Sequence, residues 1–130
     1  MPPHLFVYGT LKPGLTCTLG APERARLAAE ATAIGQATTS GILVDLGGYP
    51  GLLPGTDVVN GFVYNFGNSE MSLKWLDIYE GYSGSAAGEY RRELRNVNLA
   101  SGPILSCWTY MLIQSKVYSA VIRSGHWFPA

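Results

Sequence analysis

The stretch from Ile104 to Ile113 constrains the fold more than any other part of this sequence, because it carries bulky residues on both faces of an extended strand. Successive side chains of a β-strand point to opposite faces, so alternate residues share a face. The bulky residues of one face are Ile104, Trp108, Tyr110 and Leu112, and those of the other are Leu105, Cys107, Met111 and Ile113. Burial on both faces requires a helix on one face or a sheet that curls over itself.

Glycine, proline and small polar residues divide the rest of the chain into strands, helices and turns. The expected strands span His4–Tyr8, Ile42–Leu46, Val58–Phe66, Glu89–Leu99 and Ile104–Ile113, and the expected helices span Glu23–Ala33 and Glu70–Glu80. The last two strands are expected to form a hairpin. Asn68 or Ser69 is the expected N-cap of the second helix, Gly81 its stop, and Gly47–Gly51 a turn-rich loop.

This order of elements, without a regular alternation of strand and helix, favours an α+β fold. A partly closed sheet flanked by the two main helices would bury both apolar faces of the strand Ile104–Ile113. No linker, repeat or low-complexity segment divides the chain, so residues 1–130 are expected to form a single compact domain.

Charge and composition exclude several classes of protein. Nine basic and nine acidic residues give no net charge, and no basic run extends beyond Arg91, Arg92 and Arg95. Phosphate binding needs a concentrated basic surface, so no nucleic acid partner is expected. The chain has no stretch of about 18 apolar residues and no leader with a basic and an apolar region, which predicts no membrane partner and a cytoplasmic location.

The sequence patterns of metal and cofactor sites are missing. His4 and His126 are the only histidines, and no cluster of acidic residues supplements them. Neither nucleotide-binding glycine motif occurs, and no Gly-x-Ser-x-Gly elbow is present. Cys17 and Cys107 match no metal or disulfide pattern and are expected to be reduced, buried thiols. The expected cofactors and metals are therefore none.

A carboxylate interrupts the apolar face of the second predicted helix. At about 100° per residue, one broad arc of this helix gathers its bulky residues. They are Met71, Leu73, Trp75, Leu76, Ile78 and Tyr79. Glu80 falls on this arc between Leu76 and Leu73, although the helix has polar positions for its other charges, such as Lys74. A carboxyl group on an apolar face is typical of catalytic acids and bases, and the alternative is a structural carboxylate paired with an arginine.

The loop that follows the first strand also has a suggestive composition. Tyr8-Gly9-Thr10-Leu11-Lys12-Pro13-Gly14 holds two glycines and a proline, so its backbone can turn sharply. Such a turn can direct several N–H groups into one space, where they bind an anion or a polarised carbonyl oxygen. An ordinary connection between strand and helix is the alternative.

Taken together, these motifs resemble the γ-glutamylcyclotransferase family, including its AIG2-like and γ-glutamylamine branches. The resemblance rests on Tyr8-Gly9-Thr10-Leu11, Gly48-Tyr49-Pro50-Gly51, Leu76-Asp77-Ile78-Tyr79-Glu80-Gly81, Tyr90-Arg91-Arg92, Trp108-Thr109-Tyr110 and Gly125-His126-Trp127. It spans nearly the whole chain and implies a compact α+β domain with a small mixed barrel-like sheet and a cavity at one end. It also implies that Tyr8, Gly9, Thr10 and Leu11 bind the γ-glutamyl part of the substrate and that Glu80 is the catalytic acid and base.

The implied reaction is the cyclisation of a γ-glutamyl amide or γ-glutamylamine to 5-oxoproline, with release of the free amine. The substrate carries its own nucleophile, the α-amine, so the reaction is intramolecular and gains from proximity. Glu80 would take a proton and later return it. Backbone N–H groups of the loop from Tyr8 to Leu11 would meet the charge that develops on the γ-oxygen.

Other residues are expected in supporting positions. Tyr90 and Tyr110 either place phenolic hydroxyls near the substrate or are core tyrosines with one satisfied hydroxyl. Arg91 and Arg92 point to opposite faces of a strand, so at most one can face the cavity, and an ion pair is expected for each.

Tyr49 and Pro50 are expected at the rim of the pocket, and Lys12 is expected to be exposed. The loop from Tyr82 to Gly88 lacks the prolines that the family often has there. This departure leaves the leaving amine undetermined.

Two other functions stay open on the sequence alone. The first is a non-catalytic binding module that holds a small γ-glutamyl or acidic ligand in the same cavity. The presence of Glu80 argues against a binding module, since a pocket that only binds the carboxylate of a ligand has little use for a buried carboxylate of its own. The other is a scaffold with an exposed strand edge. The expected partner is a small-molecule γ-glutamyl substrate, and the expected state is a monomer or a homodimer.

Overall fold

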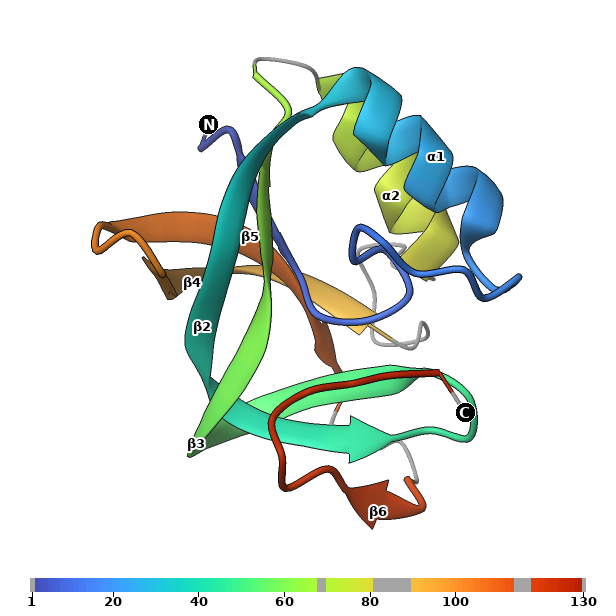
Figure 1. Ribbon diagram of the computed structural model, residues 1–130, viewed down its shortest axis with the longest axis vertical. Coiled ribbons are helices and arrows are strands. Elements are labelled where there is room, and N and C mark those ends of the chain that lie inside the picture. The colour runs from blue at the N-terminus through green and yellow to red at the C-terminus, as the bar shows by residue number, and fades with distance from the viewer. Residues whose placement is uncertain (1, 68–69, 81–89, 114–117, 130) are drawn as a thin grey trace.

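The strands form one mixed sheet that closes on itself (Figure 1). The computed structural model describes residues 2–67, 70–80, 90–113 and 118–129. The elements are β1 (His4–Val7), α1 (Ala21–Glu30), β2 (Thr32–Asp45), β3 (Pro50–Asn65), α2 (Glu70–Glu80), β4 (Tyr90–Leu99), β5 (Ile104–Leu112) and β6 (Ala120–Val121). The strand order is β3-β1-β5-β4-β2, and β2 also pairs with β3, so five strands make a closed barrel. The short β6 adds to β2. The predicted α+β class and barrel-like sheet are confirmed.

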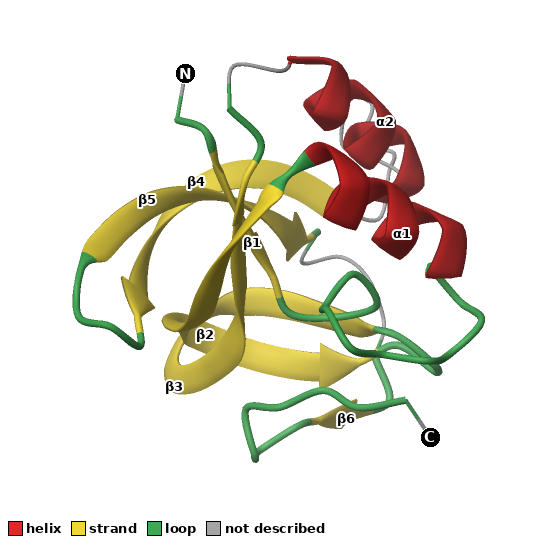
Figure 2. Ribbon diagram, turned by 45° about the horizontal axis from the view of Figure 1, so that its top comes forward, coloured by secondary structure: helices red, strands yellow, loops and turns green. Residues whose placement is uncertain are grey.

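Both faces of β5 are buried, as the sequence predicted. Cys107 and Met111 belong to one buried cluster with Phe6 and Trp127, and Tyr110 belongs to a second cluster with residues of both helices. The helices lie side by side on one side of the barrel (Figure 2). A curled sheet and a helix layer are therefore both present.

The ends of β5 differ, because its first residue lies outside both clusters. Ile104 pairs with Asn98 at the end of the β4–β5 hairpin and is 66% exposed. The predicted hairpin is confirmed, whereas the expected burial of Ile104 is wrong.

Strands β2 and β3 are much longer than the predicted strands Ile42–Leu46 and Val58–Phe66, and they pair as a hairpin that bends in the middle. Gly41 pairs with Asp57 and Ile42 with Leu53, so three residues of β3 are unpaired at the bulge. A Cβ atom on Gly41 would lie 2.6 Å from Cδ1 of Leu52, so a larger residue does not fit at the bend of the β2–β3 hairpin.

The predicted loop Gly47–Gly51 is partly wrong, because β3 begins within it. Pro50 and Gly51 are the first residues of β3 and pair with Asp45 and Val44. A Cβ atom on Gly51 would lie 2.8 Å from Cδ2 of Leu112. The glycine therefore marks a close approach inside the sheet and not a turn.

Helix α1 begins and ends earlier than predicted. Gly20 adopts a left-handed conformation with φ 77° directly before the helix, and Pro22 lies in its first turn. The helix ends at Glu30, because Thr32 and Ala33 pair with Asn65 and Tyr64 of β3. Sheet pairing thus overrides the helix propensity of the alanine-rich sequence.

Helix α2 is described from Glu70 to Glu80, and it buries a narrower arc than predicted. Leu73 and Leu76 are buried, whereas Ile78 is 81% exposed. At about 100° per residue, Ile78 lies roughly opposite Leu76, so its expected place on the apolar face is wrong. The predicted N-cap residues, the predicted stop Gly81 and the predicted loop from Tyr82 to Gly88 lie outside the described residues.

The side chain of Trp75 on α2 contacts two residues of α1. Nε1 of Trp75 donates a hydrogen bond to Glu30 at 3.1 Å, and the guanidinium of Arg26 lies 4.7 Å from the Trp75 ring centre. Neither helix of the described chain is long and apolar enough to span a bilayer.

A substitution in β3 tests the tight packing of the barrel. A Cβ atom on Gly61 would lie 2.4 Å from the Val7 carbonyl oxygen and 2.6 Å from Cζ of Phe6. Backbone and a core ring cannot both give way, so Gly61→Ala should lower the free energy of unfolding by about 2 kcal/mol. Urea denaturation measures this change. Val58→Ala, on the same strand but 62% exposed, should cost only about 0.5 kcal/mol or less.

Candidate active site

A cavity of about 290 Å³ lies where the end of β1, the start of β3, the end of α2, the start of β4 and the end of β5 meet. Every residue predicted to form the site lines it. The lining consists of Phe6, Val7, Tyr8, Gly9, Thr10, Leu11, Leu19, Tyr49, Pro50, Tyr79, Glu80, Tyr90 and Tyr110. Among these described lining residues, Glu80 is the only acidic or basic amino acid. Tyr49 and Pro50 lie at the cavity, as predicted, and the chemical roles of all these residues stay predictions.

The loop after β1 turns tightly and keeps several donors available. The backbone N–H of Lys12 donates to the Gly9 carbonyl at 3.1 Å, which closes the turn. Over the described residues, the N–H groups of Gly9, Thr10 and Leu11 donate to no protein oxygen. Backbone N–H groups in folded proteins nearly always have an acceptor. These three groups have none in the described protein, so they can bind an acceptor atom of a ligand.

Gly9 is required by the close approach of β3. A Cβ atom at this position would lie 2.8 Å from Cγ and 3.0 Å from Cδ of Pro50. The carbonyl of the same proline accepts a hydrogen bond from the hydroxyl of Tyr90 at 2.5 Å. The glycine, the proline and the tyrosine therefore position one another, although they come from the beginning, middle and end of the sequence.

Glu80 is the last residue of α2 and is half-buried at the cavity. Its place on the inner side of the helix, near Leu73 and Leu76, is as predicted. Burial is the main cause that raises the pKa of Tyr8, Tyr79 and Tyr110, and the negative charge of Glu80 adds to each shift. The carboxylate is thus electrically coupled to three phenols that line the same space.

The hydroxyls of Tyr8 and Tyr90 brace the walls of the cavity. Tyr8 donates to the backbone carbonyl of Tyr110 at 2.5 Å, just as Tyr90 donates to Pro50. Burial is the main cause that raises the pKa of Tyr8 well above its ordinary value, and the negative charge of Glu80 adds to it. Tyr8 therefore stays protonated, and its proton is held by the protein.

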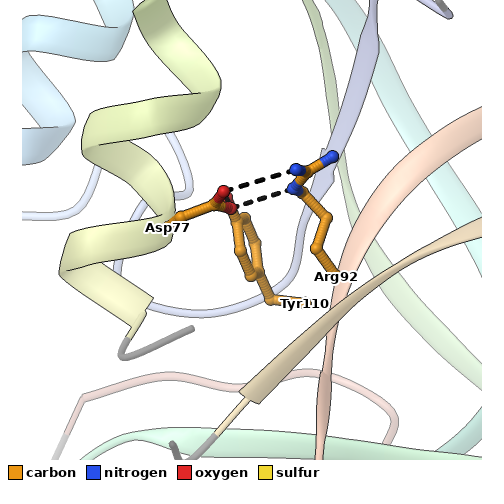
Figure 3. Close-up of polar contacts among 3 residues, drawn as sticks. All are labelled: Asp77, Arg92 and Tyr110. Carbon is orange, nitrogen blue, oxygen red and sulfur yellow. Dashed lines mark hydrogen bonds and ion pairs between the residues drawn. The ribbon is translucent and has the colours of Figure 1, made fainter. Parts of the chain in front are cut away.

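Tyr110 belongs to a polar network that sequence reasoning missed (Figure 3). Its hydroxyl donates to Oδ1 of Asp77 at 2.6 Å. Arg92 binds the same carboxylate through Nε at 2.9 Å and Nη2 at 3.3 Å. Burial, followed by the hydrogen bond to Asp77, raises the pKa of Tyr110, and Arg92 opposes this shift. In the sequence, Asp77 stood out only as part of the motif Leu76-Asp77-Ile78-Tyr79-Glu80-Gly81, which indicates neither of its partners.

The predicted ion pairs of the two neighbouring arginines are confirmed. Arg92 pairs with Asp77 at 2.9 Å, and the guanidinium of Arg92 also lies 4.4 Å from the Trp108 ring centre. Arg91 pairs with Glu93 at 2.5 Å and is 60% exposed. Neither arginine lines the cavity.

A second network, also missed, supports the loop from the side of the helices. Oγ1 of Thr10 and the hydroxyl of Tyr79 share a hydrogen bond of 2.6 Å. Arg24 of α1 donates to the Thr10 carbonyl at 2.7 Å and to the Cys17 carbonyl at 2.7 Å. Gly20 packs so closely that a Cβ atom there would lie 2.6 Å from the Tyr79 oxygen. Both helices therefore hold Thr10 in place.

The prediction that Lys12 is exposed is wrong. Its Nζ donates to the carbonyl of Trp127 at 2.5 Å and lies 4.8 Å from the Phe128 ring centre. Burial lowers the pKa of this ammonium group. Trp127 is itself buried in the barrel core, so the C-terminal segment is fastened to the loop by Lys12.

The cysteines only partly match the prediction. Both are free thiols, but Cys107 is buried and Cys17 is half-buried beside Arg24. Burial raises the pKa of Cys107 to about 11. The described part of the chain contains no group of three His, Cys, Asp or Glu residues that could hold a metal ion.

Comparison with known proteins identifies the family. A family model described as "Gamma-glutamyl cyclotransferase, AIG2-like" matches residues 5–129. A "Gamma-L-glutamyl-butirosin B gamma-glutamyl cyclotransferase" of Niallia circulans is 38% identical over 84% of this chain, and the match spans 66% of that protein. A "Putative gamma-glutamylcyclotransferase" of Vibrio cholerae is 33% identical over 95% of both proteins.

A solved structure agrees in fold and extent. The solution NMR structure of protein ytfP from Escherichia coli is 29% identical to this chain, with a TM-score of 0.59 and 95% of both chains covered. The resemblance that the sequence motifs indicated is confirmed. Because the family model covers nearly all of the chain, and relatives of similar length match it throughout, this chain belongs to the AIG2-like γ-glutamyl cyclotransferase family.

Proposed function

We propose that this protein cyclises the γ-glutamyl part of an amide or γ-glutamylamine to 5-oxoproline and releases the free amine. The observation that carries the proposal is the placement of Glu80. It shares the cavity with the loop in which the N–H groups of Gly9, Thr10 and Leu11 donate to no oxygen of the described residues. Family membership supports the reaction class.

The chemistry needs a group that moves protons. The α-nitrogen attacks the γ-carbonyl carbon, the ring C–N bond forms, and the amide C–N bond to the leaving amine breaks. An α-ammonium carries three hydrogens and the lactam nitrogen one, so two protons pass to the leaving nitrogen, which departs as an ammonium. A single carboxylate can carry them in turn, which is the role we assign to Glu80.

The loop would stabilise the charge on the reacting oxygen. During attack, the γ-carbonyl oxygen becomes an oxyanion, and backbone donors placed around it lower the barrier. The N–H groups of Gly9, Thr10 and Leu11 are suited to this, because they need no reorganisation to serve as donors. The route uses the nucleophile of the substrate itself and draws on no metal or cofactor.

A panel of substrates tests the proposal. The protein is incubated with γ-glutamyl amino acids, γ-glutamyl-ε-lysine and simple γ-glutamyl amines, and 5-oxoproline is measured by chromatography. Release from at least one class is expected, and the preferred class identifies the leaving amine. The N-glutaryl counterpart of each substrate, which lacks the α-amine, is the matched control and should give no product.

The same panel separates the enzyme from a binding module. Calorimetric titration with each compound gives its dissociation constant. Tight binding of one member without any release of 5-oxoproline would reject the enzyme and support the module. Neither binding nor turnover across the panel would reject both.

A further inference from the structure

The proton of the Tyr110 hydroxyl is committed to Asp77. The donor–acceptor distance is 2.6 Å, and an ionised carboxylate can only accept. A phenol that has given its proton to one partner can offer only oxygen lone pairs to another. Towards the cavity that it lines, Tyr110 therefore acts as an acceptor.

The proton of the Tyr8 hydroxyl is also committed to an acceptor within the protein. This proton goes to the carbonyl of Tyr110 at 2.5 Å. Tyr8, Tyr110 and Glu80 line the same cavity, and the negative charge of Glu80 acts on both phenols. This side of the cavity presents acceptors, whereas the loop from Gly9 to Leu11 presents donors.

Asp77 and Glu80 have different surroundings, because they occupy different positions on α2. They are three residues apart, so they lie on neighbouring parts of one helix face. Arg92 binds both oxygens of Asp77, and the side chains of this pair are only 18% and 20% exposed. The charge of Asp77 is thereby balanced outside the cavity lining, while that of Glu80 acts within it.

We propose that Asp77 is a positioning residue: by holding the Tyr110 proton, it makes Tyr110, Tyr8 and Glu80 an acceptor-only subsite for a primary ammonium group. This rests on the proposed function in that the group would be the α-ammonium of a γ-glutamyl ligand. An ammonium has three donors and no acceptor, which matches such a wall. A carboxylate at the same place would meet lone pairs and the negative charge of Glu80.

Two ligands that differ only in the ammonium group test this subsite. L-glutamine carries an α-carboxylate, an α-ammonium and a γ-amide, and glutaramate is the same molecule without the ammonium. Dissociation constants are measured by calorimetry for both, with NMR to follow any 5-oxoproline. Since hydrogen bonds to a charged group are worth about 1.5–3 kcal/mol, the native protein should bind L-glutamine roughly 10-fold to 100-fold more tightly than glutaramate.

The variants should change this preference selectively. Tyr110→Phe removes the acceptor oxygen and should reduce the preference by about tenfold. Asp77→Asn replaces the carboxylate by a neutral amide, which is a weaker acceptor, so the Tyr110 proton can also turn into the cavity. The preference should then fall by about threefold or more, with the glutaramate constant unchanged. Tyr118→Phe, at an exposed tyrosine that does not line the cavity, is the matched control and should leave both constants as they are.

The outcomes are distinct from those of the activity test. Equal weakening of both ligands by Asp77→Asn would show a structural role only and would overturn the inference, as would a native protein without preference for L-glutamine or without binding of either ligand. If no γ-glutamyl compound is converted, yet the preference exists and is lost in the variants, the proposed function fails and the ammonium subsite stands. If conversion occurs and Tyr110→Phe keeps the preference, the subsite alone fails.

Discussion

Glu80→Gln is expected to reduce kcat/KM for the preferred γ-glutamyl amide by about 10³-fold, because an amide cannot take and return the protons of the reaction. Glutamine has nearly the same shape as glutamate, and Glu80 is half-buried at a helix end. The change therefore removes a proton carrier without opening the core. Initial rates of 5-oxoproline release at several substrate concentrations give kcat and KM separately.

A second carboxylate-to-amide change controls for the loss of charge. Asp57 lies exposed on β3 and does not line the cavity, so Asp57→Asn should keep native kinetics. The urea midpoint of Glu80→Gln should also stay close to the native value. If the glutamine variant still releases 5-oxoproline at the native rate, Glu80 is not the proton carrier.

Gly9→Ala is expected to lower kcat by about 10²-fold, because misplacing a binding loop by about 1 Å has an effect of this size. The new methyl group would lie 2.8 Å from Cγ of Pro50, so either the loop or the proline must move. Movement of the loop displaces the N–H donors, and movement of the proline disturbs the carbonyl that holds Tyr90. The measurement is the kcat of the purified variant with its circular dichroism spectrum.

A double variant shows whether the cause is steric. Pro50→Ala removes the ring atoms that the methyl group meets, so Gly9→Ala combined with Pro50→Ala should recover much of the lost activity. Full activity in Gly9→Ala alone would contradict the close approach. Equal losses in the single and double variants would mean that the alanine harms the loop for another reason.

The elements were predictable where a pattern extends over neighbouring residues. The β4–β5 hairpin and the burial of β5 on both faces follow from alternation, and the two helices follow from helical periodicity. Boundaries failed where a distant partner decides them. Thr32 and Ala33 leave the first helix because Asn65 and Tyr64 pair with them, and Pro50 and Gly51 join a strand because β2 lies alongside.

Some residues of the site, too, were predicted from the sequence, and others were not. Motifs predicted the loop from Tyr8 to Leu11 and Glu80, and the fold brings them to one cavity. Asp77 and Arg24 were missed, since each looks like an ordinary helix surface residue until its partner is known. Tyr110 meets Asp77 across 33 positions of sequence and Tyr8 across 102.

The sequence by itself determined the kinds of elements, the α+β class, the family and the residues that carry the proposed chemistry. Periodicity and short motifs act within a few residues, so they can be read along the chain. The tertiary structure alone decided where β2 and β3 begin and end, that Lys12 is fastened to Trp127, and which partners hold the protons of Tyr8 and Tyr110. These depend on donors and acceptors from distant segments, which meet only when the barrel closes.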